Sequence, residues 1–390
     1  MADPTGPAAV PEDPGLGERH ATNLELFLDL VFVFAVTQIA LLIEDHLTVA
    51  GVLRGVLLAF LVWWQWSQFT WAGAARDLQA HTVSRLMVLC MVPVTLLMAV
   101  SIPGAYGRSG PWFGWAYFGV QVLVISMMGA LTVHGSAQRR AYVRYASLAL
   151  LSPTVVLLGG YLHGDARIVA WCVAAALDIV AALLGGGGEW ALNATHFAER
   201  HALFIIIALG EVVVAAGATA FTESQADGLR APLVLALGVV VGVTCVLWWT
   251  YFAYIPQVGE HLLAGMDPVD RGRFARDFYT YGHFPLVLGV VLYSVVAGQV
   301  VAHPHAPLPE ADRWILAVAV LLYLGGLDAL RFRVWRVWSP ERVAAIAVSL
   351  LFCAVGGSAS GVLLVGAVGI VLGLAQIVRL RRYRKDTATT

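Results

Sequence analysis

Apolar runs close to the length of a bilayer crossing recur through this chain and constrain its fold more than any other feature. Hydrophobic residues make up 59% of the 390 residues and charged residues only 13%, whereas soluble proteins carry about 25% charged residues. A membrane-spanning helix needs roughly 20 predominantly apolar residues. The sequence therefore predicts an all-α integral membrane protein with about 12 transmembrane helices. The predicted spans are 24–44, 49–74, 83–101, 112–133, 141–161, 167–184, 201–220, 231–255, 277–302, 313–331, 342–356 and 360–379.

The basic residues predict how these spans are oriented. If the N-terminus lies inside, 19 of the 24 Lys and Arg fall in cytoplasmic segments and five fall in outer loops. Cytoplasmic loops of membrane proteins carry an excess of Lys and Arg. We therefore expect a multi-pass protein with both termini in the cytoplasm. The formal net charge of −1 argues against nucleic acid as a partner.

The spans suggest two halves of six helices each. Trp63-Trp64 in the second span and Trp248-Trp249 in the eighth are separated by 185 residues, and parallel repeats of this kind occur in transporter folds. Coincidence among Trp-rich spans explains the spacing equally well, so both interpretations stay open. The predicted organisation is a disordered cytoplasmic N-terminus (1–22), a first half (23–184), a connector (185–200), a second half (201–380) and a basic, polar cytoplasmic tail (381–390).

Two carboxylates open the first span. Glu25 and Asp29 are four residues apart, so a helix stacks them on one face, one turn above the other. A membrane helix keeps such a pair only where a proton, a cation, or an Arg or His of another helix neutralises it. The sequence thus predicts a partner for these acids on a neighbouring pass.

Other ionisable residues lie within or beside the spans and form the remainder of a candidate ion, proton or substrate site. Glu211 and Asp178 fall near the middle of their spans, and His283 precedes Phe284-Pro285, where proline removes a helix hydrogen bond. Histidine exchanges protons near neutral pH. The alternative is a structural ion-pair network that only holds the helices together. Its supporting members would be Arg85, Glu199, Arg200, Arg276 and Asp277.

Aromatic and histidine motifs admit plainer explanations. Trp63, Trp64, Trp248 and Trp249 would line a cation-binding face through their rings, or would simply pack and anchor helices. His196 and His201 are five residues apart, about 140° around a helix, so they do not share a face as metal-binding histidines do. We predict no metal site, no cofactor and no catalytic residues.

Three segments resemble the signature segments of the bacterial low-temperature-requirement A family. They are LELFLDLVFVFAVTQIA, HFAERHALFIIIALGEVVVAAG and RDFYTYGHFPLVLGVVLYSVVAG, and with the Trp-rich second span the likeness covers about residues 20 to 380. The resemblance implies a multi-pass protein of the bacterial plasma membrane without an established biochemical activity. Leu28 departs from the Phe that the family often has at that place. By resemblance, the motif positions are Glu25, Asp29, Glu199, Arg200, Glu211, Arg276, Asp277, His283 and Pro285.

Three functions compete at this stage. The preferred hypothesis is a carrier in which acidic residues inside the membrane couple a proton or cation to a small solute. A membrane-embedded enzyme acting on lipid or a lipid-linked substrate is the second, although no catalytic motif supports it. A structural membrane-homeostasis protein is the third. The expected partners are the lipid bilayer and a small solute or ion, and a homo-oligomer stays open.

Overall fold

The structure, a computed structural model, describes residues 19–75, 77–130, 146, 149–185 and 192–388. Within these residues the chain is helical, with no strand beyond an isolated bridge between Pro307 and Ser360. The helices of the first part are α1 (Asn23–Glu44), α2 (Val49–Ala75), α3 (Thr82–Ser101), α4 (Gly110–Ala130), α6 (Leu151–Gly160) and α7 (Asp165–Gly185). Those of the second part are α8 (Ala194–Asp227), α9 (Ala231–Phe252), α10 (Ile255–Ala264), α11 (Pro268–Phe274), the π-helix η1 (Ala275–Tyr281), α12 (Gly282–Ala302), α13 (Glu310–Trp335), α14 (Pro340–Val355), the 3₁₀ turn η2 (Gly356–Ser358) and α15 (Gly361–Ala388).

Eleven helices of the described residues are long and apolar enough to cross a membrane. They correspond to all the predicted spans except 141–161. That span falls partly outside the described residues, and its described end forms the ten-residue helix α6. The chain is therefore a multi-pass membrane protein, and the predicted all-α class is confirmed.

Side chains that cap the first turn mark where several helices begin. The side chain of Thr22 caps α1 and that of Asn193 caps α8, each accepting a backbone N–H of the first turn. At the start of α11, Asp267 accepts the backbone N–H groups of Asp270 and Val269, and these bonds lower the pKa of its carboxyl group.

Two boundaries differ from the sequence prediction. The helix α8 begins at Ala194, so residues 194–200 of the predicted connector belong to the same helix as the seventh span. The helix α15 continues to Ala388, so most of the predicted polar tail is helical as well. The predicted disordered N-terminus lies mostly outside the described residues.

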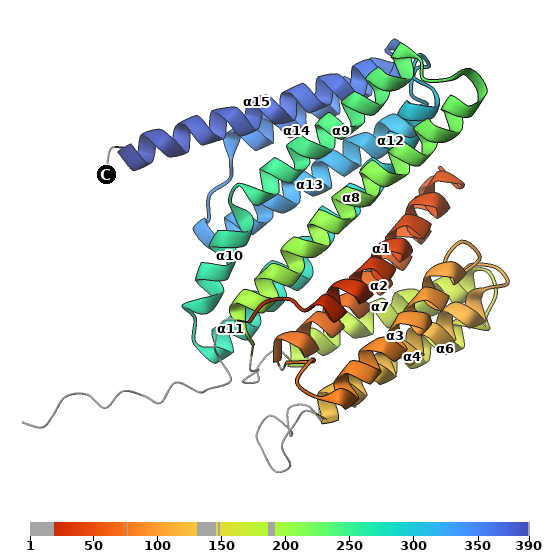
Figure 1. Cartoon of the computed structure of the whole chain (residues 1–390), viewed down its shortest axis with the longest axis vertical. Coiled ribbons are helices and arrows are strands. Elements are labelled where there is room, and N and C mark those ends of the chain that lie inside the picture. Colours follow the sequence, from red (N-terminus) through yellow and green to blue (C-terminus); the bar gives the residue numbers. More distant parts are fainter. Residues whose placement is uncertain (1–18, 76, 131–145, 147–148, 186–191, 389–390) are drawn as a thin grey trace, which may run out of the picture.

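The helices α1 to α7 gather on one side of the molecule and α8 to α15 on the other (Figure 1). On the first side α3 packs on α1 and α4, and α6 packs on α4 and α7; on the second, α13 packs on α12 and α14, and α15 packs on α14 and α9. The helices α1 and α2 meet α8 and α12 between the two groups.

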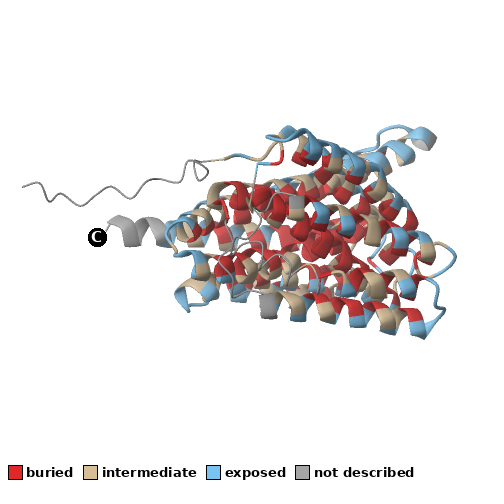
Figure 2. Cartoon of the chain, turned by 90° about the horizontal axis from the view of Figure 1, so that it is seen from below, coloured by how far each residue is buried: buried red, intermediate tan, exposed pale blue. Residues whose placement is uncertain are grey.

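Buried residues concentrate along this interior, whereas exposed residues lie on the outer faces and loops (Figure 2). Outward-facing side chains such as Leu30, Leu53 and Phe221 are apolar and more than half exposed, as a lipid-facing surface requires.

Candidate functional site

The first acid of α1 is bound to both its own helix end and to α8. Glu25 forms a capping box with Thr22, accepting its backbone N–H at 2.9 Å and its hydroxyl at 2.8 Å. The Nε2 of His196 on α8 lies 3.0 Å from the Oε1 of Glu25. Glu25 is only 1% exposed. The predicted partner from another helix is therefore a histidine of α8.

One turn deeper, Asp29 pairs with an arginine. Its Oδ1 accepts a hydrogen bond from the Nη2 of Arg200 at 2.7 Å and another from the indole Nε1 of Trp66 at 2.8 Å. Asp29 and Arg200 are both 0% exposed. The guanidinium also lies near the ring of Phe69, 5.2 Å from its centroid, which adds a cation–π contact. An ion pair thus lies fully buried in the interior of the protein.

These two pairs show that α1 and α8 run in the same direction. On α1 the acids are four residues apart, and on α8 His196 and Arg200 are also four residues apart. Each acid pairs with the residue 171 positions further along the chain. A matching order of partners requires parallel helices, since antiparallel helices would reverse it. Parallel first and seventh spans agree with an even number of reversals between them.

The Asp29 cluster retains hydrogen-bonding capacity that no protein group uses. The Oδ2 of Asp29 and the Nε and Nη1 of Arg200 are buried and have no hydrogen-bond partner within the described part of the chain. Buried polar groups usually have partners, because leaving them unpaired costs free energy. The pair can therefore accept a proton on its open carboxylate oxygen or donate to a ligand oxygen.

Two histidines lie side by side beyond Arg200. The rings of His201 on α8 and His283 on α12 have centroids 5.3 Å apart, and both residues are buried. The Nδ1 of His283 faces the carbonyl of Phe278 at 3.1 Å, so it carries the hydrogen, and Nε2 accepts from the hydroxyl of Tyr251 at 2.8 Å. The Nδ1 of His201 faces the carbonyl of Phe197 at 2.9 Å, and its Nε2 is buried with no partner among the residues that the structure describes.

The backbone before His283 has an unusual form that proline explains. Pro285 has no N–H to bond the carbonyl of Tyr281, four residues earlier, and its ring disfavours regular α-helix there. The π-helix η1 ends at Tyr281. Such π-helical turns within longer helices occur frequently at functional sites. The sequence prediction that Pro285 loosens the local helix is consistent with this irregularity.

Helix α2 holds the π-helix through side chains of one face. The Nε1 of Trp63 donates to the carbonyl of Thr280 at 2.8 Å, and the Nε1 of Trp71 donates to the hydroxyl of Thr280 at 3.0 Å. The hydroxyl of Ser67 lies 3.1 Å from the same hydroxyl. With Trp66 bound to Asp29, α2 contacts both the ion pair and the π-helix η1.

Several predicted site residues lie apart from this cluster. Glu211 is partly exposed on α8, eleven residues and roughly 16 Å beyond Arg200 at about 1.5 Å per residue. Asp178 is buried between α7 and α4, where it accepts the hydroxyl of Tyr117 at 3.3 Å. Neither acid therefore shares the surroundings of Asp29. Glu211 lies further along α8, and Asp178 lies on α7 beside α4.

Of the predicted supporting residues, one pairs with an acid of α1 and the others have different partners. Arg200 neutralises an acid of α1, but Arg85 donates to the carbonyl of Gln79 at 2.6 Å instead. Arg276 pairs with its neighbour Asp277 at 2.7 Å. Glu199 lies 3.1 Å from the Nδ1 of His20 in the segment before α1.

The predicted aromatic lining is divided as well. Trp63 and Trp64 are buried, and Trp64 stacks on Tyr281 at 6.2 Å between ring centroids. Trp248 and Trp249 are 46% and 39% exposed. The two tryptophan pairs that suggested the repeat therefore have different surroundings.

Sequence reasoning overlooked part of the cluster. The sequence alone does not predict Trp66, Tyr251 or Thr280 as site residues, and it presents His196 only in a possible metal motif. The signal for Trp66 was its position three residues after Trp63, on one face of α2. No sequence signal linked Tyr251 to His283, because their contact depends on how α9 packs on α12.

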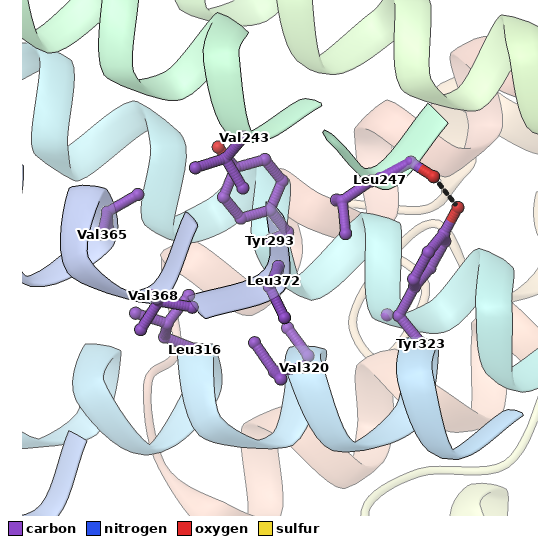
Figure 3. A pocket seen from close by; sticks show the side chains of 11 residues that line it. Val243, Leu247, Tyr293, Leu316, Val320, Tyr323, Val365, Val368 and Leu372 are labelled. Carbon is purple, nitrogen blue, oxygen red and sulfur yellow. Dashed lines mark hydrogen bonds between the residues drawn. The ribbon is translucent and has the colours of Figure 1, made fainter. Parts of the chain in front are cut away.

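Apart from this cluster, an apolar recess lies among α9, α12, α13 and α15 (Figure 3). Its two tyrosine hydroxyls are turned to backbone carbonyls: Tyr293 donates to Val240 and Tyr323 donates to Leu247, each at 2.8 Å. The lining thus offers no free polar group to orient a ligand. The residues that line it are Val243, Leu247, Gly289, Tyr293, Leu316, Ala319, Val320, Tyr323, Val365, Val368 and Leu372.

Comparison with known proteins gives a family and no activity. The family model described as bacterial low temperature requirement A protein matches residues 20–377. A protein of Rhizobium meliloti (strain 1021), itself described as uncharacterised, is 28% identical over 390 residues, covering 95% of this chain and 92% of that protein. No solved structure matches the chain.

Proposed function

We propose that this chain, which belongs to the bacterial low temperature requirement A family, is a proton-coupled carrier of a small solute in the bacterial plasma membrane, with both termini in the cytoplasm. Membership confirms the resemblance seen in the three signature segments. The observation that carries the proposal is the fully buried Asp29–Arg200 pair at the boundary between the two groups of helices. Intramembrane ionisable residues mark ion pathways and proton relays in transporters.

The position of the pair suits alternating access. In many carriers the site lies between two helix groups that rock against each other, and it includes an interrupted helix. Here the pair joins α1 to α8, and α2 links it through Trp66 and Trp63 to the π-helix η1, which leads into α12. A change in charge at Asp29 therefore acts on the contact that a rocking motion must open.

Protonation supplies that change in charge. When the open Oδ2 of Asp29 takes a proton, the carboxyl group loses its charge and its attraction for the Arg200 guanidinium. The Nη2 of Arg200 is then released, and together with the already open Nε and Nη1 it binds an oxygen of an incoming solute. Release of the proton on the other side restores the pair. Each half of the cycle thus exchanges one partner of Arg200 for another.

Flux in liposomes tests the proposal. Purified protein is reconstituted with an entrapped pH-sensitive dye, a pH gradient is imposed, and amino acids, sugars, organic acids and nucleosides are added in turn. The wild type is expected to show proton flux that depends on one of these solute classes, and Asp29→Asn is expected to abolish it. Folded wild-type protein without solute-dependent flux for any class would contradict the proposal.

Asp328→Asn is the matched control. Asp328 also pairs with a buried arginine, Arg342, at 3.2 Å, and their side chains are 1% and 3% exposed. That pair lies between α13 and α14, away from the boundary of α1 and α8. This variant is expected to retain flux. Loss of flux in both variants would point to general damage from removing any buried carboxylate.

The complete burial of the pair favours a second candidate function. A static protein of membrane homeostasis would use the pair only to join α1 to α8, as buried ion pairs can specify one packing arrangement. In that case uncharged substitutions at Asp29 or Arg200 would lower stability, and no solute would drive proton flux.

A further inference from the structure

Arginines gather where α13, α14 and α15 end or begin together. Arg331 lies in the last turns of α13, Arg342 in the first turn of α14, and Arg379 near the end of α15. The helix α14 packs on both α13 and α15, which brings these arginines to one end of the bundle. The distribution of basic residues predicts that this end of the bundle faces the cytoplasm.

The ion pairs in this cluster use only part of the donors. Arg342 is 2% exposed and donates its Nη1 to Asp328 at 3.2 Å, but its Nε and Nη2 are buried without a partner in the described residues. The same holds for the Nε of Arg331 and the Nη1 of Arg379. The guanidinium of Arg379 lies over the ring of Tyr254, 5.0 Å from its centroid, which fixes its plane.

The charges around these donors are unbalanced. Arg382 joins the cluster by donating to Glu341 at 3.4 Å. Among the side chains that the structure describes, four guanidinium groups (Arg331, Arg342, Arg379 and Arg382) share two carboxylates, those of Asp328 and Glu341, which leaves positive charge in excess. One turn before Arg379, the Nε2 of Gln376 is another buried donor for which the described part of the chain provides no partner. The open side-chain groups of these described residues are all N–H donors, so a partner that satisfies them is an acceptor.

We propose that this cluster binds a phosphate-type anion. A phosphate group offers several oxygens around one centre, and guanidinium groups donate to such oxygens in pairs. The excess of positive charge attracts its negative charge, and a bound phosphate would satisfy donors that otherwise stay buried and unpaired. The phosphate comes either from the headgroup of an anionic lipid, because the cluster lies at a helix end near the membrane surface, or from free inorganic phosphate. This site is separate from Asp29 and does not depend on the proposed transport.

Binding to the full-length protein tests the site and separates the two sources. Delipidated protein in detergent is titrated with phosphatidylglycerol, with phosphatidylcholine and with inorganic phosphate, and bound molecules are counted by native mass spectrometry. Arg379→Gln is expected to lower the affinity by about tenfold or more, the loss of one charge-assisted hydrogen bond. Arg381→Gln is the control, because Arg381 is exposed on the same turn of α15, and it is expected to bind as the wild type does.

Thermal unfolding is the second measurement, and it shows whether each variant folds. The bound anion is expected to raise the Tm of the wild type and of Arg381→Gln more than that of Arg379→Gln. Preference for phosphatidylglycerol over phosphatidylcholine supports the site with a lipid source, and saturation by inorganic phosphate alone supports it with a soluble source. Equal binding of both anions by the wild type and a folded Arg379→Gln protein would overturn the proposal.

Discussion

Replacing Asp29 with Asn is the perturbation whose effect follows most directly from the structure. The Oδ1 of Asp29 accepts the Nη2 of Arg200 at 2.7 Å, and neither side chain is exposed. Asparagine keeps the shape of the side chain but removes its charge, so the buried guanidinium loses the carboxylate to which it is hydrogen-bonded. Breaking a buried pair by removing one partner costs about 3–5 kcal/mol.

That cost translates into a measurable change in Tm. At ~2.1 cal/mol/K per residue, a chain of 390 residues has an unfolding entropy of about 0.8 kcal/mol/K. A loss of 3–5 kcal/mol then lowers the Tm by about 4–6 °C. Intrinsic tryptophan fluorescence during heating in detergent measures this shift, because Trp66 lies against the pair.

A double variant checks the reason for the shift. In Asp29→Asn with Arg200→Gln neither charge is buried, so most of the lost stability is expected to return. An Asp29→Asn protein with the Tm of the wild type would refute the reasoning, since the structure leaves Arg200 no other carboxylate within hydrogen-bonding distance in the described residues.

Two further substitutions test the surroundings of the same acids. A Cβ on Gly73 would meet the Oε1 of Glu25, so Gly73→Ala is expected to cost about 1–3 kcal/mol through overpacking; Gly210, whose Cβ would meet nothing within 4 Å, is the control, and Gly210→Ala should raise the Tm slightly because alanine favours helix. Trp66→Phe removes one of the two hydrogen bonds to the Oδ1 of Asp29, and a loss of about 1.5–3 kcal/mol is expected for a bond to a charged group. Thermal unfolding measures each change, and a Gly73→Ala protein more stable than Gly210→Ala would contradict the packing described here.

Hydropathy predicted the fold well because each transmembrane helix carries its own signal. Apolar length and composition are properties of one segment, so eleven spans could be recognised without knowing their neighbours. The ends were less predictable. The extension of α8 back to Ala194 depends on the cap that Asn193 provides, and hydropathy does not register it.

The site was harder to predict because it depends on pairing between helices. The spacing of Glu25 and Asp29 required partners on another helix, but several basic residues near span ends were equally suitable from the sequence alone. Parallel packing of α1 against α8 selected His196 and Arg200 and left Arg85 at a different place. Pairings of this kind follow from three-dimensional packing, which no local pattern of the sequence records.

The double variant Asp29→Asn with Arg200→Gln gives the most direct test of the central claim, that this pair takes part in transport in addition to holding α1 and α8 together. Its proton flux in liposomes is measured with the solute that drives flux in the wild type, on protein whose Tm has recovered. The account predicts that flux stays absent although stability returns. Wild-type flux in this double variant would contradict it and would leave the pair a purely structural role.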